Sequence, residues 1–241
     1  MRIAIISDIH GNLEAFEQVL ADIEKFQVDD IISLGDHIGY GPDPERVICR
    51  IRQNKLTAVK GNHELAVIKP AYLNWFNRAA RTSLKITQKY LSPESIAFIA
   101  NLKNHRTAYG CRFVHGFPPD SVLTYLFQIS DEEKTQTLKS LAERRCFIGH
   151  THTLDIVSYG RQGLKSGQLK EGLHKLNAQC KYIISAGSVG QPRDGNNKAK
   201  YLIWDASDDT VEVKYVAYDI AAVVEKMMAA GLPLEHAKRL W

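Results

Sequence analysis

The segment RIAIISDIHGN, residues 2–12, places two metal-compatible side chains directly after a short apolar run. The apolar residues RIAII, 2–6, predict a buried strand, and Asp8 and His10 follow it two positions apart. Because side chains along a strand repeat every two residues, we expect the carboxylate of Asp8 and the imidazole of His10 to point at one place. Such a pair is typical of a metal site or of an acid–base site, and this stretch alone does not distinguish the two.

The composition is that of a globular protein with one domain or two. The chain has 241 residues, a net charge of +4 and four cysteines that form no CxxC pair. A small, scattered charge does not favour a nucleic-acid partner, and isolated cysteines favour a reduced, intracellular chain. The N-terminal residues resemble a strand rather than a signal peptide, and no apolar run is long enough to span a membrane. We therefore expect a cytoplasmic protein without a membrane partner.

Strands and helices alternate in the first third of the chain. The expected strands lie at 2–6, 30–34 and 56–59, and the expected amphipathic helices lie at 13–26 and 43–51. Asn12 and Asp43 stand where the N-caps of these two helices belong. This alternation favours a largely parallel, layered sheet.

The remainder of the chain has a different pattern. Residues 64–101 are expected to be mostly helical, with a helix restart at Ser92-Pro93-Glu94. Further strands are expected at 111–116, 146–150, 154–160, 181–187, 201–205 and 210–216, and further helices at about 131–143, 219–230 and 233–241. No repeat, low-complexity tract or Gly/Ser linker divides the chain. We predict a single domain, residues 1–241, with a helical insertion at about 65–105.

Metal-compatible side chains recur where the predicted strands stop. They are Asp8, His10, Asp36, Asn62, His115, His150 and His152. Layered α/β sheets bind ligands beyond the carboxyl ends of their strands, so these groups would meet on one side. Each residue alone is equally well explained by a turn, a helix cap or a buried, hydrogen-bonded histidine. Their joint placement at strand ends favours a common site.

Five short blocks in this order resemble a known family. SDIHG, GDHIGYG, GNHE, VHG and GHTH look like the five motifs of the calcineurin-like metallophosphoesterases, and the resemblance covers residues 1–206. GSVGQPRDG at 187–195 and GDHIGYGPDP at 35–44 are similar to a bacterial branch of that superfamily. The resemblance implies a layered α/β/β/α sandwich with mixed sheets, helices outside, and a dinuclear metal site at the carboxyl ends of the strands.

The resemblance also implies which residues hold the metals. The first ion would be bound by Asp8, His10, Asp36 and His152, and the second by Asp36, Asn62, His115 and His150. Asp36 would bridge the two ions, which a carboxylate with two oxygens can do. This mixture of imidazole, carboxylate and amide ligands suits divalent transition metals, with Mn expected first and Fe, Zn, Ni or Co as alternatives.

The implied reaction is hydrolysis of a phosphomonoester or phosphodiester of a small molecule or nucleotide. A metal-bound hydroxide would attack phosphorus in line, and His63 would protonate the leaving group as general acid. Arg193 is a candidate contact to the substrate phosphate because a planar guanidinium matches phosphate oxygens. The alternative for Arg193 is a surface ion pair, with Asp194 as a partner.

The sequence departs from the protein serine/threonine phosphatases of this superfamily. Those enzymes carry an Asp three positions after the bridging Asp, where it partners the catalytic histidine. Here that position is Gly39, and the next is Tyr40 rather than Arg. A phosphoprotein substrate is therefore less favoured, and the sequence does not identify the group that orients His63.

Other functions remain open at this stage. A metal-dependent nuclease would need a basic track beside the site, a non-catalytic scaffold would not need the complete ligand set, and a metal-storage protein would not need His63. The aromatic residues Tyr72, Trp75, Phe76 and Tyr90 fit a substrate wall or a helical core. The expected partner is a small phosphate ester or nucleotide, and the chain is also compatible with a homo-oligomer.

Overall fold

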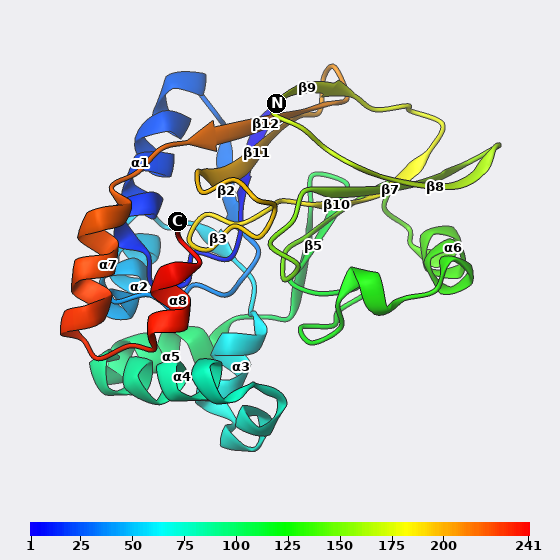
Figure 1. The fold of residues 1–241 in the computed structure, drawn as a ribbon. Helices are drawn as coiled ribbons and strands as arrows, with labels where there is room; N and C mark the ends of the chain where they lie inside the picture. The colour runs from blue at the N-terminus through cyan, green and yellow to red at the C-terminus, as the bar shows by residue number, and fades with distance from the viewer.

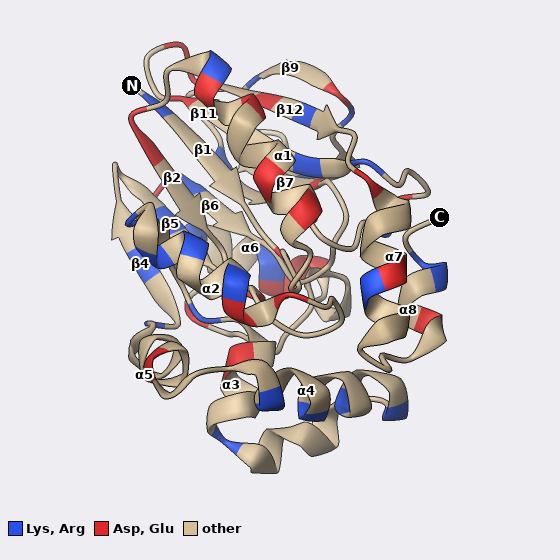
Figure 2. Cartoon of the chain, turned by 90° about the vertical axis from the view of Figure 1, so that its left-hand side faces the viewer, with Lys and Arg blue, Asp and Glu red and all other residues tan.

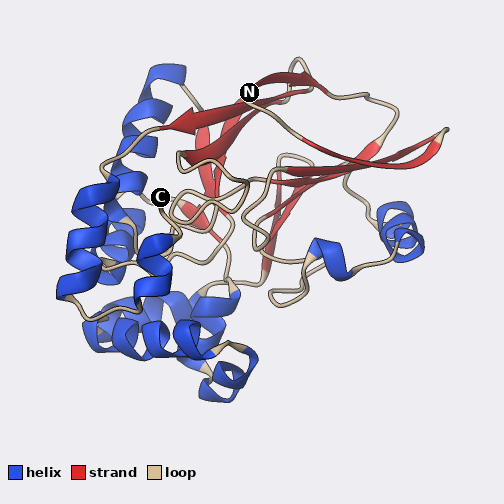
Figure 3. Ribbon diagram, in the orientation of Figure 1, coloured by secondary structure: helices blue, strands red, loops and turns tan.

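The computed structural model describes residues 1–241 and contains two six-stranded β-sheets that pack face to face. Helices lie on the outer face of each sheet, so the layers run helix, sheet, sheet, helix (Figure 3). The N-terminus starts a strand in the first sheet, and the C-terminus lies beside loops at the strand ends (Figure 1). The expected α/β/β/α sandwich is confirmed.

The first sheet has the strand order β3-β2-β1-β11-β12-β9. Its strands are β1 (Arg2–Ile6), β2 (Asp30–Ser33), β3 (Thr57–Ala58), β9 (Gly172–Lys175), β11 (Ala199–Asp205) and β12 (Thr210–Val216). β1, β2 and β3 run parallel, so their carboxyl ends meet at one edge, whereas β11 pairs with β1 antiparallel.

The second sheet has the order β4-β5-β6-β10-β7-β8. Its strands are β4 (His105–Ala108), β5 (Cys111–Val114), β6 (Arg145–Ile148), β7 (Asp155–Gly160), β8 (Gly163–Gln168) and β10 (Lys181–Ser185). β5, β6 and β10 are parallel, and β4, β7 and β8 are antiparallel to their neighbours. Both sheets are thus mixed. The parallel strands expected in the first third are confirmed in β1, β2 and β3. The mixed sheets that the resemblance implied are also confirmed, because short hairpin turns join several later strands.

Alternating side chains of β1 hold the layers together. Ile3 and Ile5 are fully buried between the two sheets, and Ala4 and Ile6 are fully buried under the outer helices. The second sheet contributes Phe113 and Phe147, whose ring centroids lie 5.6 Å apart in the inter-sheet core. Burial on both faces explains why RIAII reads as a continuous apolar run rather than an alternating one.

The outer helices are close to those expected. They are α1 (Leu13–Ile23), α2 (Pro44–Gln53), α6 (Asp131–Ser140), α7 (Ile220–Ala229) and α8 (Leu234–Lys238). Asn12 caps α1 as expected by accepting a hydrogen bond from Ala15 N at 3.0 Å. Asp43 occupies the N-cap position of α2, but its side chain accepts from Lys226 Nζ at 2.9 Å instead. None of the helices has the length and apolar character needed to cross a membrane.

The segment between β3 and β4 is helical, as expected. It contains α3 (Asn62–Ile68), a 3-10 helix at Pro70–Trp75, α4 (Arg78–Tyr90) and α5 (Pro93–Asn101). Ser92 caps α5 at the expected restart by accepting from Ser95 N at 3.1 Å. These helices share a small apolar core with α2, so the segment packs against the main sandwich. The prediction that the whole chain forms one domain stays a prediction.

Three strands were not expected from the sequence. β4, β8 and β9 have few apolar residues, and most of β8 is exposed. Hydrogen bonding to a neighbouring strand determines their conformation, and β8 pairs along its length with β7 in a hairpin. Local periodicity carries no signal for such edge strands because they bury little apolar surface.

Candidate metal centre

The structure brings all seven predicted ligands and His63 into one buried cluster. They follow β1, β2, β5 and β6 or begin α3, and none is more than 7% exposed. Their ligand atoms form three overlapping groups in which all atoms lie within 4.8 Å of one another: Asp8, His10 and His152; His10, Asp36 and His63; and Asp36, His115 and His150. Two of these groups match the two halves of the expected dinuclear site, and Asn62 lies 2.9 Å from His115.

Left-handed backbone conformations aim most of these side chains inward. The φ angles of Asp8, His10, Asp36, His150 and His152 lie between 50° and 69°. Asp and His are among the residues that tolerate this region best, and a cluster of such residues is typical of a functional site. The expected reason for the convergence of Asp8 and His10 was wrong, because β1 ends at Ile6 and both residues lie in a turn rather than in extended backbone.

The loops that carry the ligands are hydrogen-bonded to one another. Asp8 N donates to Gly35 O at 3.0 Å, and His10 N donates to Asp36 O at 2.9 Å. A Cβ at Gly61 would lie 2.1 Å from Oδ1 of Asp36, so only glycine allows this approach of the two loops. The backbone therefore fixes the relative positions of the ligands from both loops.

Each of four histidines uses one ring nitrogen to bind a backbone carbonyl. The pairs are His10 Nδ1 with Ile38 O (3.1 Å), His115 Nδ1 with Leu34 O (2.8 Å), His152 Nδ1 with Gln191 O (2.6 Å) and His150 Nε2 with Leu123 O (3.1 Å). A carbonyl only accepts, so each of these nitrogens carries the proton. The other ring nitrogen then presents a lone pair to the cluster, as in metal-binding histidines.

The free ring nitrogens face one another in pairs. His10 Nε2 lies 3.1 Å from His152 Nε2, and His115 Nε2 lies 3.1 Å from His150 Nδ1. Oδ1 of Asp8 is buried without a hydrogen-bond partner and lies 3.3 Å from His152 Nε2. Facing lone pairs and an unpartnered buried carboxylate oxygen are stabilised by a cation between them. The residues therefore fit a pair of divalent metal ions.

Asp36 lies between the two halves of the cluster. Its Oδ2 is 3.4 Å from His115 Nε2 and 3.7 Å from His10 Nε2, which belong to opposite halves. Its Oδ1 accepts a hydrogen bond from His63 N at 2.9 Å, which fixes the carboxylate plane. This is the position that a bridging ligand requires.

Burial and charge set the protonation of the cluster. Burial lowers the pKa of His150 to about 3 and holds the pKa of His152 well below its ordinary value. Burial acts in the same direction on His115, but Asp36 outweighs it and raises the pKa of His115 to about 9. Burial alone would raise the pKa of Asp8, yet the surrounding imidazoles, His152 above all, hold it well below its usual value. Asp8, His150 and His152 are therefore in the protonation states that bind metals, whereas His115 would release a proton when a metal binds.

Comparison with known families agrees with this geometry. A family model described as the calcineurin-like phosphoesterase superfamily domain matches residues 1–209. The chain belongs to this superfamily. It is 35% identical over 250 residues to protein MJ0912 of Methanocaldococcus jannaschii, a match that covers 99% of this chain and 97% of that protein.

Two solved structures and a further sequence relative are similar to this chain. A metallophosphoesterase from Sphaerobacter thermophilus is 34% identical, with a TM-score of 0.85 and coverage of 100% of this chain and 98% of that one. Protein PH1004 from Pyrococcus horikoshii shares the fold at 18% identity and a TM-score of 0.81, covering 100% and 97% of the two chains. The zinc-dependent endopolyphosphatase of Saccharomyces cerevisiae is 35% identical over 220 residues, which cover 85% of this chain and 62% of that protein.

Glu64 supports the loop that carries Asp36, a role that the sequence did not indicate. A Glu in the first turn of a helix stabilises the start of that helix, but the fully buried carboxylate of Glu64 also accepts from Asp36 N (2.9 Å), His37 N (2.9 Å) and Gly61 N (2.8 Å). Burial alone would raise its pKa, but His37 and these hydrogen bonds lower the pKa of Glu64 to about 2. Glu64 therefore shapes the loop that presents Asp36.

Replacement of Glu64 by Gln is expected to destabilise the fold. One carboxylate oxygen becomes an NH2 group that faces backbone N–H donors, which costs about 3 kcal/mol and lowers Tm by roughly 6–12 °C in a chain of this size. Thermal unfolding followed by circular dichroism measures this, with Glu225→Gln as control because the side chain of Glu225 is exposed and makes no hydrogen bond. Equal Tm values for the two variants would contradict the assigned role.

His63 is held by rings rather than by a carboxylate. Its ring centroid lies 4.6 Å from those of His10 and Tyr40 and 4.9 Å from that of Phe76. Its Nδ1 has no hydrogen-bond partner and faces Gly39, where an added Cβ would lie only 2.1 Å away. The missing Asp of the serine/threonine phosphatases is thus replaced by aromatic packing, with Tyr40 as a residue that sequence reasoning did not assign.

A cavity of about 260 Å³ opens beside the cluster. It is lined by Tyr40, Asn62, Trp75, Phe76, Asn77, Ala80, Leu123, Tyr125 and His150. Trp75 and Phe76 therefore belong to the wall that we considered, whereas Tyr72 packs against the helical core and Tyr90 lies outside the cavity. Tyr125 stacks on His150 with centroids 3.7 Å apart, and no sequence signal identified it.

Arg193 lies in the loop between β10 and β11, next to the cluster. Its backbone N donates to His152 O at 3.3 Å, and its guanidinium donates to Gln191 Oε1 at 3.2 Å. The alternative of an ion pair with Asp194 is excluded, because Asp194 instead binds the buried Lys200 at 2.7 Å. The guanidinium of Arg193 therefore keeps its positive charge unpaired and has further N–H donors for an anion.

Proposed function

We propose that the protein is a dinuclear-metal phosphoesterase that hydrolyses a phosphomonoester or phosphodiester of a small molecule or nucleotide. The observation that carries this proposal is the pair of buried histidine–carboxylate groups between which Asp36 lies, each with ring nitrogens that face one another. Membership of the superfamily supports a phosphoester hydrolase in general terms.

The residues divide the work between binding and proton transfer. Asp8, His10, Asp36 and His152 would hold one ion, and Asp36, Asn62, His115 and His150 the other. Bound divalent ions would lower the pKa of a water molecule and neutralise charge on the phosphoryl oxygens. Arg193 would bind a phosphoryl oxygen, and Nε2 of His63 would donate a proton to the leaving oxygen.

The acid role of His63 depends on the substrate. Burial lowers the pKa of His63 well below its ordinary value, so its ring is neutral at neutral pH before substrate enters. An anionic phosphate next to the ring opposes this effect because negative charge favours the protonated imidazole. A bound phosphate would therefore favour the protonated form of His63 that a general acid needs.

A nuclease is the second candidate, and one feature favours it. Helix α4 borders the cavity and carries Arg78, Arg81, Lys85 and Lys89 without an acidic residue (Figure 2). Elsewhere in this view, acidic and basic residues are interspersed, for example on α7 and α8. A basic helix beside the site also suits a small polyanion, and the modest net charge favours that reading.

The experiment that tests the proposal measures metals and turnover together. We expect about two divalent ions per chain and manganese-dependent hydrolysis of 4-nitrophenyl phosphate or bis(4-nitrophenyl) phosphate. Chelation should lower turnover at least about 100-fold, and added Mn²⁺ should restore it. Bound metal with no turnover of either ester would instead support the non-catalytic scaffold. Preferential cleavage of single-stranded DNA or RNA would support the nuclease.

A further inference from the structure

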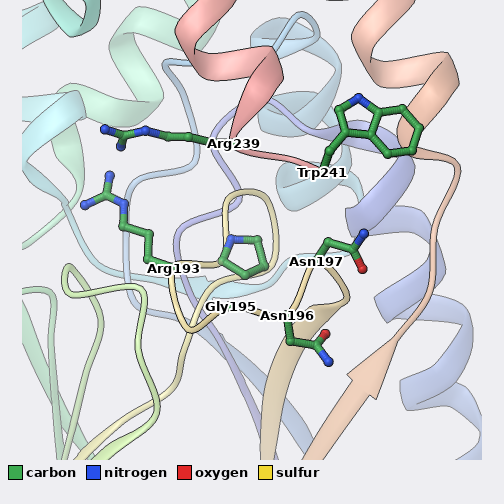
Figure 4. Close-up of a pocket in the computed structure, with 7 residues that line it drawn as sticks. Arg193, Gly195, Asn196, Asn197, Arg239 and Trp241 are labelled. Carbon is green, nitrogen blue, oxygen red and sulfur yellow. The ribbon is translucent and has the colours of Figure 1, made fainter.

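A second cavity, of about 480 Å³, lies between the β10–β11 loop and the C-terminal end of the chain. Figure 4 shows it, and it is lined by Pro192, Arg193, Gly195, Asn196, Asn197, Arg239 and Trp241. No metal ligand belongs to this cavity, so it is distinct from the cavity beside Trp75. Arg239 and Trp241 are not part of the metal centre or of the sequence motifs.

The cavity holds two arginines without acidic partners. Arg193 and Arg239 form no ion pair, and Figure 4 shows their guanidinium groups on the same side of the cavity. The nearest candidate carboxylate in the loop, Asp194, is bound to Lys200. Two guanidinium groups repel each other unless an anion lies between them, and their planar donors suit a phosphate.

This cavity adjoins the metal centre through both of its walls. On the loop side, the backbone of Arg193 is hydrogen-bonded to His152. On the helix side, the buried ring of His236 packs against Tyr40 at 4.5 Å, and Tyr40 packs against His10 at 4.4 Å. A substrate bound at the metals can therefore extend into the cavity along Arg193.

The opposite side of the cavity offers an aromatic surface. Trp241 is 69% exposed, and its indole lies across the cavity from the guanidinium groups, close to Asn197 (Figure 4). An exposed indole binds nucleobases by stacking, and the amide of Asn197 beside it can pair with a polar base edge. Phosphate donors on one side and a stacking ring on the other are complementary to a nucleotide.

We propose that this cavity is the outer subsite of a nucleoside polyphosphate substrate. One phosphoryl group would bind at the metals, a second would bind between Arg193 and Arg239, and the base would stack on Trp241. The cleavage of a nucleotide bound in this way rests on the proposed phosphoesterase function. Binding of the nucleotide in the cavity needs no metal. The subsite therefore accounts for the two unpaired arginines and for the exposed indole together.

Calorimetry on the metal-free protein in chelator tests the subsite directly. The two probes are ATP, which carries a nucleobase, and inorganic tripolyphosphate, which does not. We expect Arg239→Gln to weaken both about tenfold or more, and Trp241→Ala to weaken ATP about tenfold while sparing tripolyphosphate. Lys238→Gln is the matched control, because Lys238 directly precedes Arg239 at the end of α8, lies outside the cavity and carries the same charge.

Each outcome decides the assignment. Failure of the native protein to bind ATP, or equal affinities in Arg239→Gln and Lys238→Gln, would overturn it. Equal loss of both probes in Trp241→Ala would remove the base from the subsite. Turnover of bis(4-nitrophenyl) phosphate by the metal-loaded protein is measured in parallel. Turnover with no effect of Arg239→Gln would reject the subsite alone, whereas the expected binding pattern without any turnover would reject the proposed function alone.

Discussion

Asp36→Asn is expected to lower kcat/KM for phosphate esters by at least about 10³-fold and to reduce the bound metal. The substitution keeps the size of the side chain but replaces one carboxylate oxygen by an amide nitrogen, which donates and does not bind a cation. Oδ2 of Asp36 lies 3.4 Å from His115 Nε2 and 3.7 Å from His10 Nε2, so both halves of the centre lose the same ligand. Metal analysis and steady-state kinetics measure the effect.

Asp208→Asn is the control for this change. Asp208 is exposed, lies in the turn between β11 and β12, and is far in the fold from the ligand loops. We expect it to retain both metal content and turnover. Circular dichroism of both variants separates lost chemistry from lost fold. If folded Asp36→Asn kept native turnover, a shared ligand at this position would be ruled out.

The layers of the fold are predictable because buried strands and helices have recognisable patterns of apolar residues in the sequence. Residues 3–6 are buried on both faces of β1 and are continuously apolar, and α1 carries its apolar stripe toward the sheet. β8 and β9 have no such pattern, since their polar residues are placed by pairing with β7 and β12. The early parallel strands were thus predictable, and the mixed character of the sheets followed only from the family resemblance.

The candidate site was predictable in residue type but not in geometry. Metal-compatible residues at strand ends point to Asp8 or His115 without any structure. The left-handed turn at His10 and the contact between Gly39 and His63 depend on loops that meet only in the folded chain. Glu64 illustrates the same limit, because a Glu at the start of a helix has an adequate local explanation and its contacts with Asp36 and His37 are tertiary.

His63→Ala should slow esters with poor leaving groups far more than esters with good ones. An alkoxide needs a proton as it departs, so loss of the acid should cost alkyl esters about 10²–10⁴-fold, whereas 4-nitrophenolate leaves unprotonated and should lose no more than about tenfold. Metal content should be unchanged. His63 lies in one group with His10 and Asp36, so it could itself bind a metal ion. Loss of metal in His63→Ala would show that His63 is a ligand.

Gly39→Ala is a second, independent test of proton transfer by His63, because it displaces the His63 ring without removing it. Its Cβ would lie 2.1 Å from His63 Nδ1, and Gly39 has a φ of 84°, which alanine rarely adopts. The ring is packed against Tyr40 and Phe76, so it must leave its position to relieve the clash. We expect the same dependence on leaving group as in His63→Ala, with metals retained. If both variants lost good and poor leaving groups equally, His63 would bind or position the substrate rather than protonate it.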